Sequence, residues 1–159
     1  MSQRANDLKD KLQAFNKEFI SFIESCSDED WKKMCEWEKW SVGVTAHHVG
    51  ALHYGTIDMA RNIVNGEQLP ALTEKQLIEM DNQLARENAS ITREEVLAIT
   101  KTNGDALAKF AAGLTDEELD RKGYLELMKT DVSTQQFLEA VIVQSGGEHL
   151  ANMRKAVGR

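Results

Sequence analysis

The four histidines of this sequence fall in two places: His47, His48 and His53 lie in one segment, and His149 lies near the other end of the chain. Imidazole nitrogens are the commonest protein ligands of zinc and bind other divalent transition metals well. A catalytic centre of this kind uses three protein ligands and keeps one position for water or substrate. The histidine pattern therefore indicates metal binding as the first chemistry to consider.

Helical spacing places the histidines of the first segment on different faces of a predicted helix. At about 100° per residue, His48 and His53 lie about 140° apart and straddle an apolar stripe, whereas His47 points outward. Tyr54 shares the side of His47, so we expect it at the surface or in an interface. His149 falls in the middle of the apolar stripe of its own segment, and a buried imidazole needs a polar partner.

The residues alone leave two interpretations open. In the first, His149 forms a hydrogen bond across the fold to a carbonyl or hydroxyl group, and His48 packs at the core margin. In the second, His48 and His149 are two ligands of a metal, and the third is His53, a nearby carboxylate or solvent.

Long helices must position these side chains. Pro70 is the only proline among 159 residues, which favours uninterrupted helices. Apolar residues recur at spacings of three and four in four long segments, about residues 4–26, 42–65, 92–114 and 133–158. The predicted fold class is all-α, a four-helix bundle that forms a single domain over residues 1–159.

Shorter segments connect the predicted helices. We expect a helical turn that carries Trp31, a polar helix over residues 73–87 that begins with a capping box, and another turn after Thr115. Residues 121–132 lack a helical face and are predicted to form a loop, with a brief extended piece around Tyr124.

Composition narrows the class of protein. The chain has 19 Lys and Arg against 26 Asp and Glu, a net charge of -7, which disfavours nucleic acid as a partner. We see no run of roughly 18 apolar residues that would cross a membrane and no signal peptide, so we expect a cytoplasmic protein without a membrane partner. Cys26 and Cys35 are too few for a disulfide framework and are expected to be reduced thiols in or near the core.

Several residues, in this order along the chain, carry a family resemblance. They are Trp40, Ser41, Val42 and His48 in the order W-S-V-x-x-x-x-x-H, then Gly66, Glu67 and Pro70, then His149 and Asn152. With the helix lengths, this order resembles the DinB-like family of four-helix bundles over essentially the whole chain.

The resemblance implies a divalent metal, zinc or nickel, bound by one histidine of the second long helix and two of the fourth, spaced H-x-x-x-H. His48 matches the first ligand and His149 the last. Ser145 stands where the middle histidine is expected, and a hydroxyl is a poor ligand unless it is ionised. His53 compensates for this departure, or the site is degenerate; both readings stay open here.

The family contains thiol-dependent transferases and isomerases. We therefore expect a divalent-metal-dependent hydrolase or thiol transferase that acts on a small molecule, with a metal site of His48, His53 and His149 between the second and fourth long helices. The partners expected are a small-molecule substrate or thiol, and the resemblance also allows a homodimer. The alternative is a metal-free bundle with a degenerate site, which binds a small ligand or serves as a dimeric scaffold.

Overall fold

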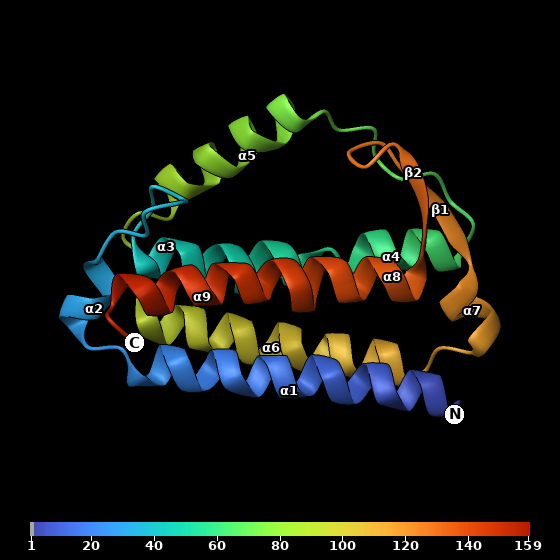
Figure 1. Cartoon of the computed structure of the whole chain (residues 1–159), viewed down its shortest axis with the longest axis horizontal. Helices are drawn as coiled ribbons and strands as arrows, with labels where there is room; N and C mark the ends of the chain where they lie inside the picture. The colour runs from blue at the N-terminus through green and yellow to red at the C-terminus, as the bar shows by residue number, and fades with distance from the viewer. Residues whose placement is uncertain (1) are drawn as a thin grey trace.

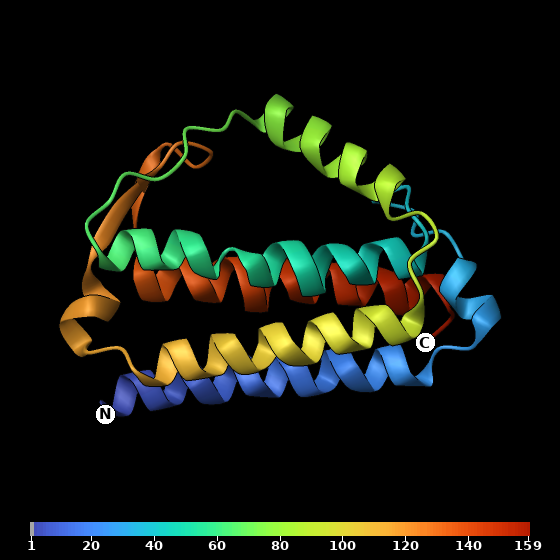
Figure 2. The same ribbon diagram turned by 180° about the vertical axis from the view of Figure 1, so that it is seen from behind.

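The computed structural model describes residues 2–159, and four helical rods run side by side through it (Figures 1 and 2). The first is α1 (Gln3–Ser25), and the third is α6 (Arg93–Ala112). The second consists of α3 (Val42–His47), η1 (His48–His53) and α4 (Ile57–Val64), and the fourth of α8 (Thr134–Leu138), η2 (Glu139–Ser145) and α9 (Gly146–Ala156). The predicted all-α four-helix bundle is confirmed.

Three further helices and a hairpin connect the rods. The helices are α2 (Asp28–Lys32), α5 (Glu74–Glu87) and α7 (Asp116–Asp120). Strands β1 (Lys122–Leu125) and β2 (Thr130–Ser133) pair antiparallel, with Lys122 opposite Ser133. The prediction of a loop over residues 121–132 is thus wrong in part: the extended piece around Tyr124 exists, but it pairs with a second strand. That strand, with its exposed first residues, carries no apolar alternation to reveal it.

Hydroxyl side chains mark where helices begin. Ser41 Oγ accepts a hydrogen bond from the Val44 amide and so starts the second rod directly after the Trp-rich segment. Thr73, Thr115 and Ser133 form complete capping boxes with the glutamine or glutamate three residues later. The starts of α5, α7 and the fourth rod therefore agree with the sequence.

Two of the rods contain a π-helical segment, η1 in the second and η2 in the fourth. A π-helix has i→i+5 hydrogen bonds and takes roughly one residue more per turn than an α-helix. Every position after such a segment is consequently displaced around the rod relative to a continuous α-helix.

In the second rod, this displacement changes which residues face the core. Helical spacing from Val49 predicts Leu52, Thr56, Met59 and Ile63 on the core face. Ile63 is buried as predicted, but the other three are only half-buried. The core positions are taken instead by Tyr54, Ile57 and Ala60. Tyr54, expected at the surface or an interface, is only 1% exposed, and its hydroxyl donates to Asn16 Oδ1 of α1 at 2.9 Å.

The fourth rod shows the same displacement. Helical spacing predicts Ile142, Ser145, His149 and Met153 on its core face. Ile142 and Met153 are buried as predicted, but Gly146 and Leu150 are buried in place of Ser145 and His149. The expectation that His149 lies in the middle of the buried stripe is therefore wrong. Its side chain is 18% exposed and lies at the core margin, which suits a residue that must meet a ligand.

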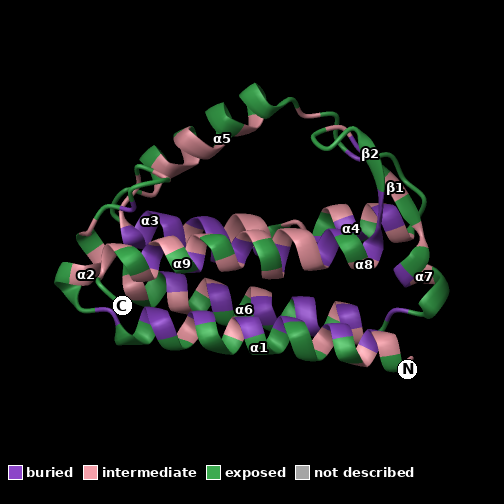
Figure 3. Cartoon of the chain, in the orientation of Figure 1, coloured by how far each residue is buried: buried purple, intermediate pink, exposed green. Residues whose placement is uncertain are grey.

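The helix α5 lies apart from the four rods and spans them as an arch (Figures 1 and 3). None of the residues described in α5 is buried. Trp40 ties the arch to the bundle, because its indole Nε1 donates to Asn82 Oδ1 at 3.2 Å. Across residues 2–159, no helix is both long enough and apolar enough to cross a membrane.

Gly50, in the middle of η1, provides a test of how closely the rods pack. A Cβ at this position would lie 2.3 Å from the Thr100 Oγ1 atom of α6. We predict that Gly50→Ala lowers the free energy of unfolding by about 1–3 kcal/mol, the usual cost of overpacking a core. Urea unfolding of Gly50→Ala, Thr100→Ala and the double variant measures the effect. In the double variant the hydroxyl is gone, so part of the loss should be recovered; strictly additive effects would contradict this packing.

Candidate functional site

Three histidines converge between the second and fourth rods. The ring centroids of His48 and His53 lie 4.7 Å apart, and each lies 5.1 Å from that of His149. One potential ligand atom from each lies within 4.8 Å of the others. The structure thus brings together the three residues predicted as a metal site, while His47 is half-buried outside this group.

The π-helical geometry of η1 explains why His48 and His53 meet. In an α-helix, residues five apart lie about 140° apart around the axis. In a π-helix of roughly 4.4 residues per turn, the same two residues lie roughly 50° apart. His48 begins η1 and His53 ends it, so the two imidazoles lie on one face, with their Nε2 atoms 3.0 Å apart.

A backbone carbonyl orients His53. Its Nδ1 atom lies 2.9 Å from the carbonyl oxygen of Val141, which belongs to η2. A carbonyl only accepts, so Nδ1 carries the hydrogen and Nε2 keeps a free lone pair. In the metal-free chain, His48 Nε2 then donates to His53 Nε2, and the buried His48 Nδ1 has no hydrogen-bond partner among the described residues.

Glu38 orients His149. One carboxyl oxygen, Oε2, lies 3.4 Å from His149 Nδ1, and Asn152 Nδ2 donates to both oxygens at 3.0 and 3.3 Å. The Glu38 side chain is 2% exposed, so these contacts replace the water it has lost. Because Nδ1 is engaged by the carboxyl group, Nε2 of His149 is the nitrogen left for a metal.

Glu38 was not predicted from the sequence. The residue lies in an irregular segment between two tryptophans, and no periodicity or motif distinguishes it from the neighbouring charged side chains. Its turn is defined by backbone geometry instead: Lys39 has a φ of 62°, and the Cys35 amide donates to the Trp40 carbonyl at 2.8 Å. The only sequence signal was the position of Glu38 two residues before Trp40, which belongs to the W-S-V motif.

Two further side chains border the histidines. The Trp40 ring packs against His48, with 5.0 Å between the ring centroids. Asp81 of α5 is half-buried, and burial raises the pKa of its carboxyl group, while the nearby His149 opposes that change. The arch helix therefore places an acidic group on the side of the site that faces away from the core.

Burial keeps two of the histidines neutral. It lowers the pKa of His48 to about 3, and repulsion from a protonated His53 adds to this effect. It lowers the pKa of His53 to about 4, although the hydrogen bond to Val141 acts in the opposite direction. Neutral imidazoles are the form that binds metals.

The donor set fits a divalent transition metal. An ion about 2.0–2.1 Å from two imidazole nitrogens holds those nitrogens roughly 3.0–3.4 Å apart. The 3.0 Å between the Nε2 atoms of His48 and His53 lies at the lower end of that range. Three nitrogen donors, two of them fixed by outer partners, are an arrangement that could hold such an ion.

The cysteines are separate from this chemistry. Cys26 and Cys35 are buried free thiols, as expected. Burial raises the pKa of both thiols, which disfavours the reactive thiolate. They are therefore part of the core.

Comparison with known proteins bears on the fold. No protein-family model matches the chain, and no curated protein matches its sequence. Among solved structures, that of YfiT from Bacillus subtilis matches with a TM-score of 0.78 and 16% sequence identity, over 99% of this chain and 90% of the other. The chain has the YfiT fold. YfiT itself is described as a probable metal-dependent hydrolase with an unusual four-helix bundle topology.

The YfiT fold confirms the expected likeness to DinB-like bundles at the level of architecture. It also explains the wide separation of the site residues along the chain. In this topology, the second and fourth rods are neighbours, so that η1 contacts both η2 and α9. Residues 48, 53 and 149 meet although about a hundred positions separate the last two.

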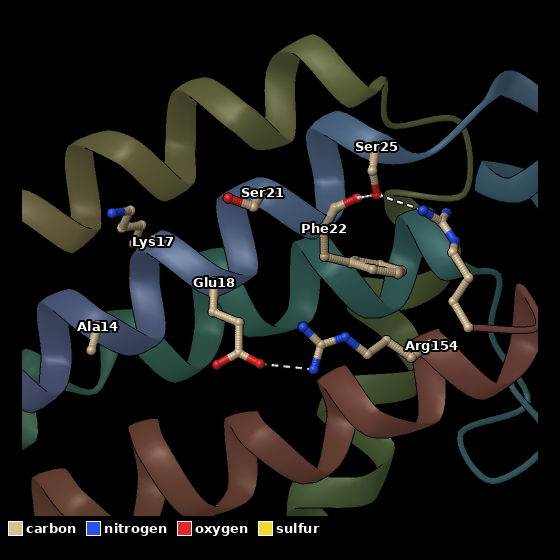
Figure 4. Close-up of a pocket in the computed structure, with 8 residues that line it drawn as sticks. Ala14, Lys17, Glu18, Ser21, Phe22, Ser25 and Arg154 are labelled. Atoms are coloured by element: carbon tan, nitrogen blue, oxygen red, sulfur yellow. Dashed lines mark hydrogen bonds and ion pairs between the residues drawn. The ribbon is translucent and has the colours of Figure 1, made fainter.

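Two surface grooves differ in their relation to the histidines. One groove runs along α1 and α9 and is lined by two arginines that each have a partner on α1 (Figure 4). Arg154 contacts Glu18 at 2.8 Å, and Arg159 donates to Ser25 Oγ. The other groove, of about 820 Å³, lies between residues 34–39 and α9 and reaches Asn152, the partner of Glu38. Only this second groove adjoins the residues that orient His149.

The lowered pKa values predict how stability depends on pH. The unfolded chain takes up a proton on each histidine near pKa 6.5, whereas the folded chain does so only near 3 and 4. Between these values the unfolded state binds more protons, so stability is fully present above pH 6.5 and is lost as the pH falls toward 4. Each histidine adds up to about 1.4 kcal/mol per pH unit.

Urea unfolding of metal-free protein between about pH 7.5 and pH 4.5 measures this dependence. A His48→Phe/His53→Leu double variant is the comparison, because it keeps the carboxylates that also titrate in acid. The wild type should lose stability more steeply than the double variant. Parallel curves would show that the two histidines are not held neutral by the fold.

Proposed function

We propose that this protein is a divalent-metal-dependent hydrolase of a small molecule, with the metal, zinc or nickel, bound by His48, His53 and His149. The observation that carries the proposal is the convergence of these three imidazoles. In His53 and His149, the Nδ1 atom already has a partner in the protein, which leaves Nε2 for the metal. YfiT, which has the same fold, is described as a probable hydrolase of this metal-dependent class.

Several residues around the proposed metal site would have separate roles in the reaction. When bound, a divalent ion supplies Lewis acidity and lowers the pKa of a water or a thiol. Val141 and Glu38 hold the rings of His53 and His149 so that each directs Nε2 toward the common centre. The Glu38 carboxyl group accepts the hydrogen of His149 Nδ1, and a carboxylate in this position fixes the tautomer and ring orientation of a metal-binding histidine. Trp40 covers His48 and limits the access of water.

A small substrate fits the surroundings of the site. The groove next to Asn152 has a volume of about 820 Å³, within the usual range for small-molecule pockets. Its lining combines the exposed Trp37 ring with charged side chains of both signs, Lys39, Lys155, Glu36 and Glu148. We propose that a substrate enters along this groove and reaches the histidines past Glu38.

Metal content is the decisive measurement. Tag-free wild-type protein, analysed by inductively coupled plasma mass spectrometry after exposure to zinc or nickel, should hold about one ion per chain. His48→Gln, His53→Gln and His149→Gln should each weaken binding by more than about 100-fold, since loss of a ligand costs more than loss of an outer partner. His47→Gln is the matched control and should bind as the wild type does. Equal binding by all four variants, or none by a folded wild type, would overturn the proposal.

Glu38 gives a second prediction. Glu38→Gln keeps the size of the side chain but replaces the carboxyl oxygen beside His149 Nδ1, and we expect metal affinity to fall roughly 10- to 100-fold. Glu36→Gln is the matched control, because Glu36 is an exposed neighbour whose ion-pair partner is Lys155, at 3.3 Å. A competition titration with a zinc chelator gives both affinities. Equal losses in the two variants would remove Glu38 from the site.

Turnover then separates the reaction classes. A panel of small esters, amides and electrophiles is offered to the metal-loaded protein with and without a low-molecular-weight thiol. Product that forms from water alone supports the hydrolase. Product that requires the thiol would overturn hydrolysis in favour of thiol transfer with the same metal site, and folded, metal-free protein that binds apolar ligands would favour the non-catalytic alternative.

A further inference from the structure

The η1 segment needs a reason to adopt a π-helix, because the same residues could continue α3 as an ordinary α-helix. Its π-helical form is what brings His48 and His53 onto one face. An α-helical form would turn them about 140° apart and separate the two Nε2 atoms. Contacts that select the π-helix therefore determine whether the histidine cluster exists.

The third rod makes two such contacts from one face. Asn103 Nδ2 of α6 donates to the carbonyl oxygen of Gly50 at 2.9 Å, in the middle of η1. One turn earlier on α6, Thr100 lies against Gly50 itself, where only a residue without a side chain fits. Thr100 Oγ1 is buried and has no hydrogen-bond partner among the described residues. Of the two residues, only Asn103 therefore forms a hydrogen bond to η1.

We propose that Asn103 is a positioning residue for the histidine site: its amide holds the Gly50 carbonyl where the π-helical backbone places it, and so keeps His48 and His53 on one face. The proposal rests on the proposed metal site but concerns a residue that would touch neither metal nor substrate. A change of η1 to an α-helix rotates the carbonyl of Gly50 away from α6 and leaves the Asn103 amide without this acceptor.

The opposite side of η1 shows why one amide has this influence. His53 is held from the fourth rod, where its Nδ1 donates to Val141 in η2. Asn103 holds η1 from the third rod, three residues earlier at Gly50. The segment is thus fixed at its middle and at its end by partners on two different rods, and loss of the middle contact lets His48 turn relative to His53.

The experiment compares metal affinity with stability. Asn103→Leu removes the donor at similar size, and Asn103→Ala removes it with the least new bulk in case the leucine does not fit. Thr92→Ala is the control: it removes the N-terminal cap of the same helix, where Thr92 Oγ1 accepts from the Glu95 amide, far from η1. Zinc affinity is measured by chelator competition and stability by thermal unfolding.

We expect the Asn103 variants to bind zinc roughly tenfold or more weakly, as for residues that orient metal ligands. Thr92→Ala should lose thermal stability but keep the zinc affinity of the wild type. A merely structural Asn103 would lower the unfolding temperature without changing zinc affinity, and that result would overturn the proposal.

A metal-independent readout keeps this inference separate from the proposed function. In metal-free protein, the nuclear Overhauser contacts between the ring protons of His48 and His53 report their approach. They should be present in the wild type and Thr92→Ala and be lost in the Asn103 variants. If the wild type binds no zinc, the proposed function fails, and these ring contacts alone decide the role of Asn103: contacts that persist in Asn103→Leu overturn it.

Discussion

A single hydrogen bond joins the two irregular segments of this bundle: His53 at the end of η1 donates to the Val141 carbonyl in η2. Regular α-helices use their carbonyls internally, so a side chain that reaches a carbonyl of a neighbouring rod finds an acceptor most readily where the helical pattern is interrupted. Here both partners lie in π-helical segments. The bond therefore links the register of the second rod to that of the fourth, and the histidine site lies at that link.

The same irregularity sets the division between core and site. After each π-helical segment, the buried face advances by one residue, so that Tyr54 and Leu150 enter the core. His53 and His149 are left at the core margin, where each has one ring nitrogen engaged by the protein and one facing the cluster. A continuous α-helix would bury His149 in the apolar stripe and turn His53 away from His48. Interrupted helices thus allow a polar centre beside an apolar core without placing a charge inside it.

Outside the rods, the Trp-rich segment and the arch helix complete the surroundings. The turn at Lys39 directs Glu38 toward His149, while Trp40 packs on His48 and holds α5 through Asn82. Four parts of the chain that are far apart in sequence therefore meet at one place: the Trp-rich segment, η1, α5 and α9. The histidines are thus surrounded by protein, and Asn152, the partner of Glu38, lies at the edge of the neighbouring groove.

The amino-acid sequence by itself determined the rods. Apolar residues at helical spacing, hydroxyl caps such as Ser41 and Ser133, and the single proline were sufficient for the fold class and for most helix ends, because these are local preferences and a one-sided apolar pattern. The order of motifs around Trp40, His48 and His149 was likewise sufficient to select the candidate ligands. The geometry that unites them was decided only by the tertiary structure.

The physical reason is that a π-helical turn has no local signature. Residues 48–53 are compatible with an α-helix, and their form depends on Gly50 against Thr100, on the Asn103 amide and on the carbonyl of Val141, all distant in sequence. Extrapolation at 100° per residue consequently misplaced Tyr54 and His149. Glu38 was missed for a related reason, since its approach to His149 depends on a turn and on burial by α9. Hydrophobic periodicity predicts the buried face of a single helix, whereas the geometry of this site depends on contacts between helices.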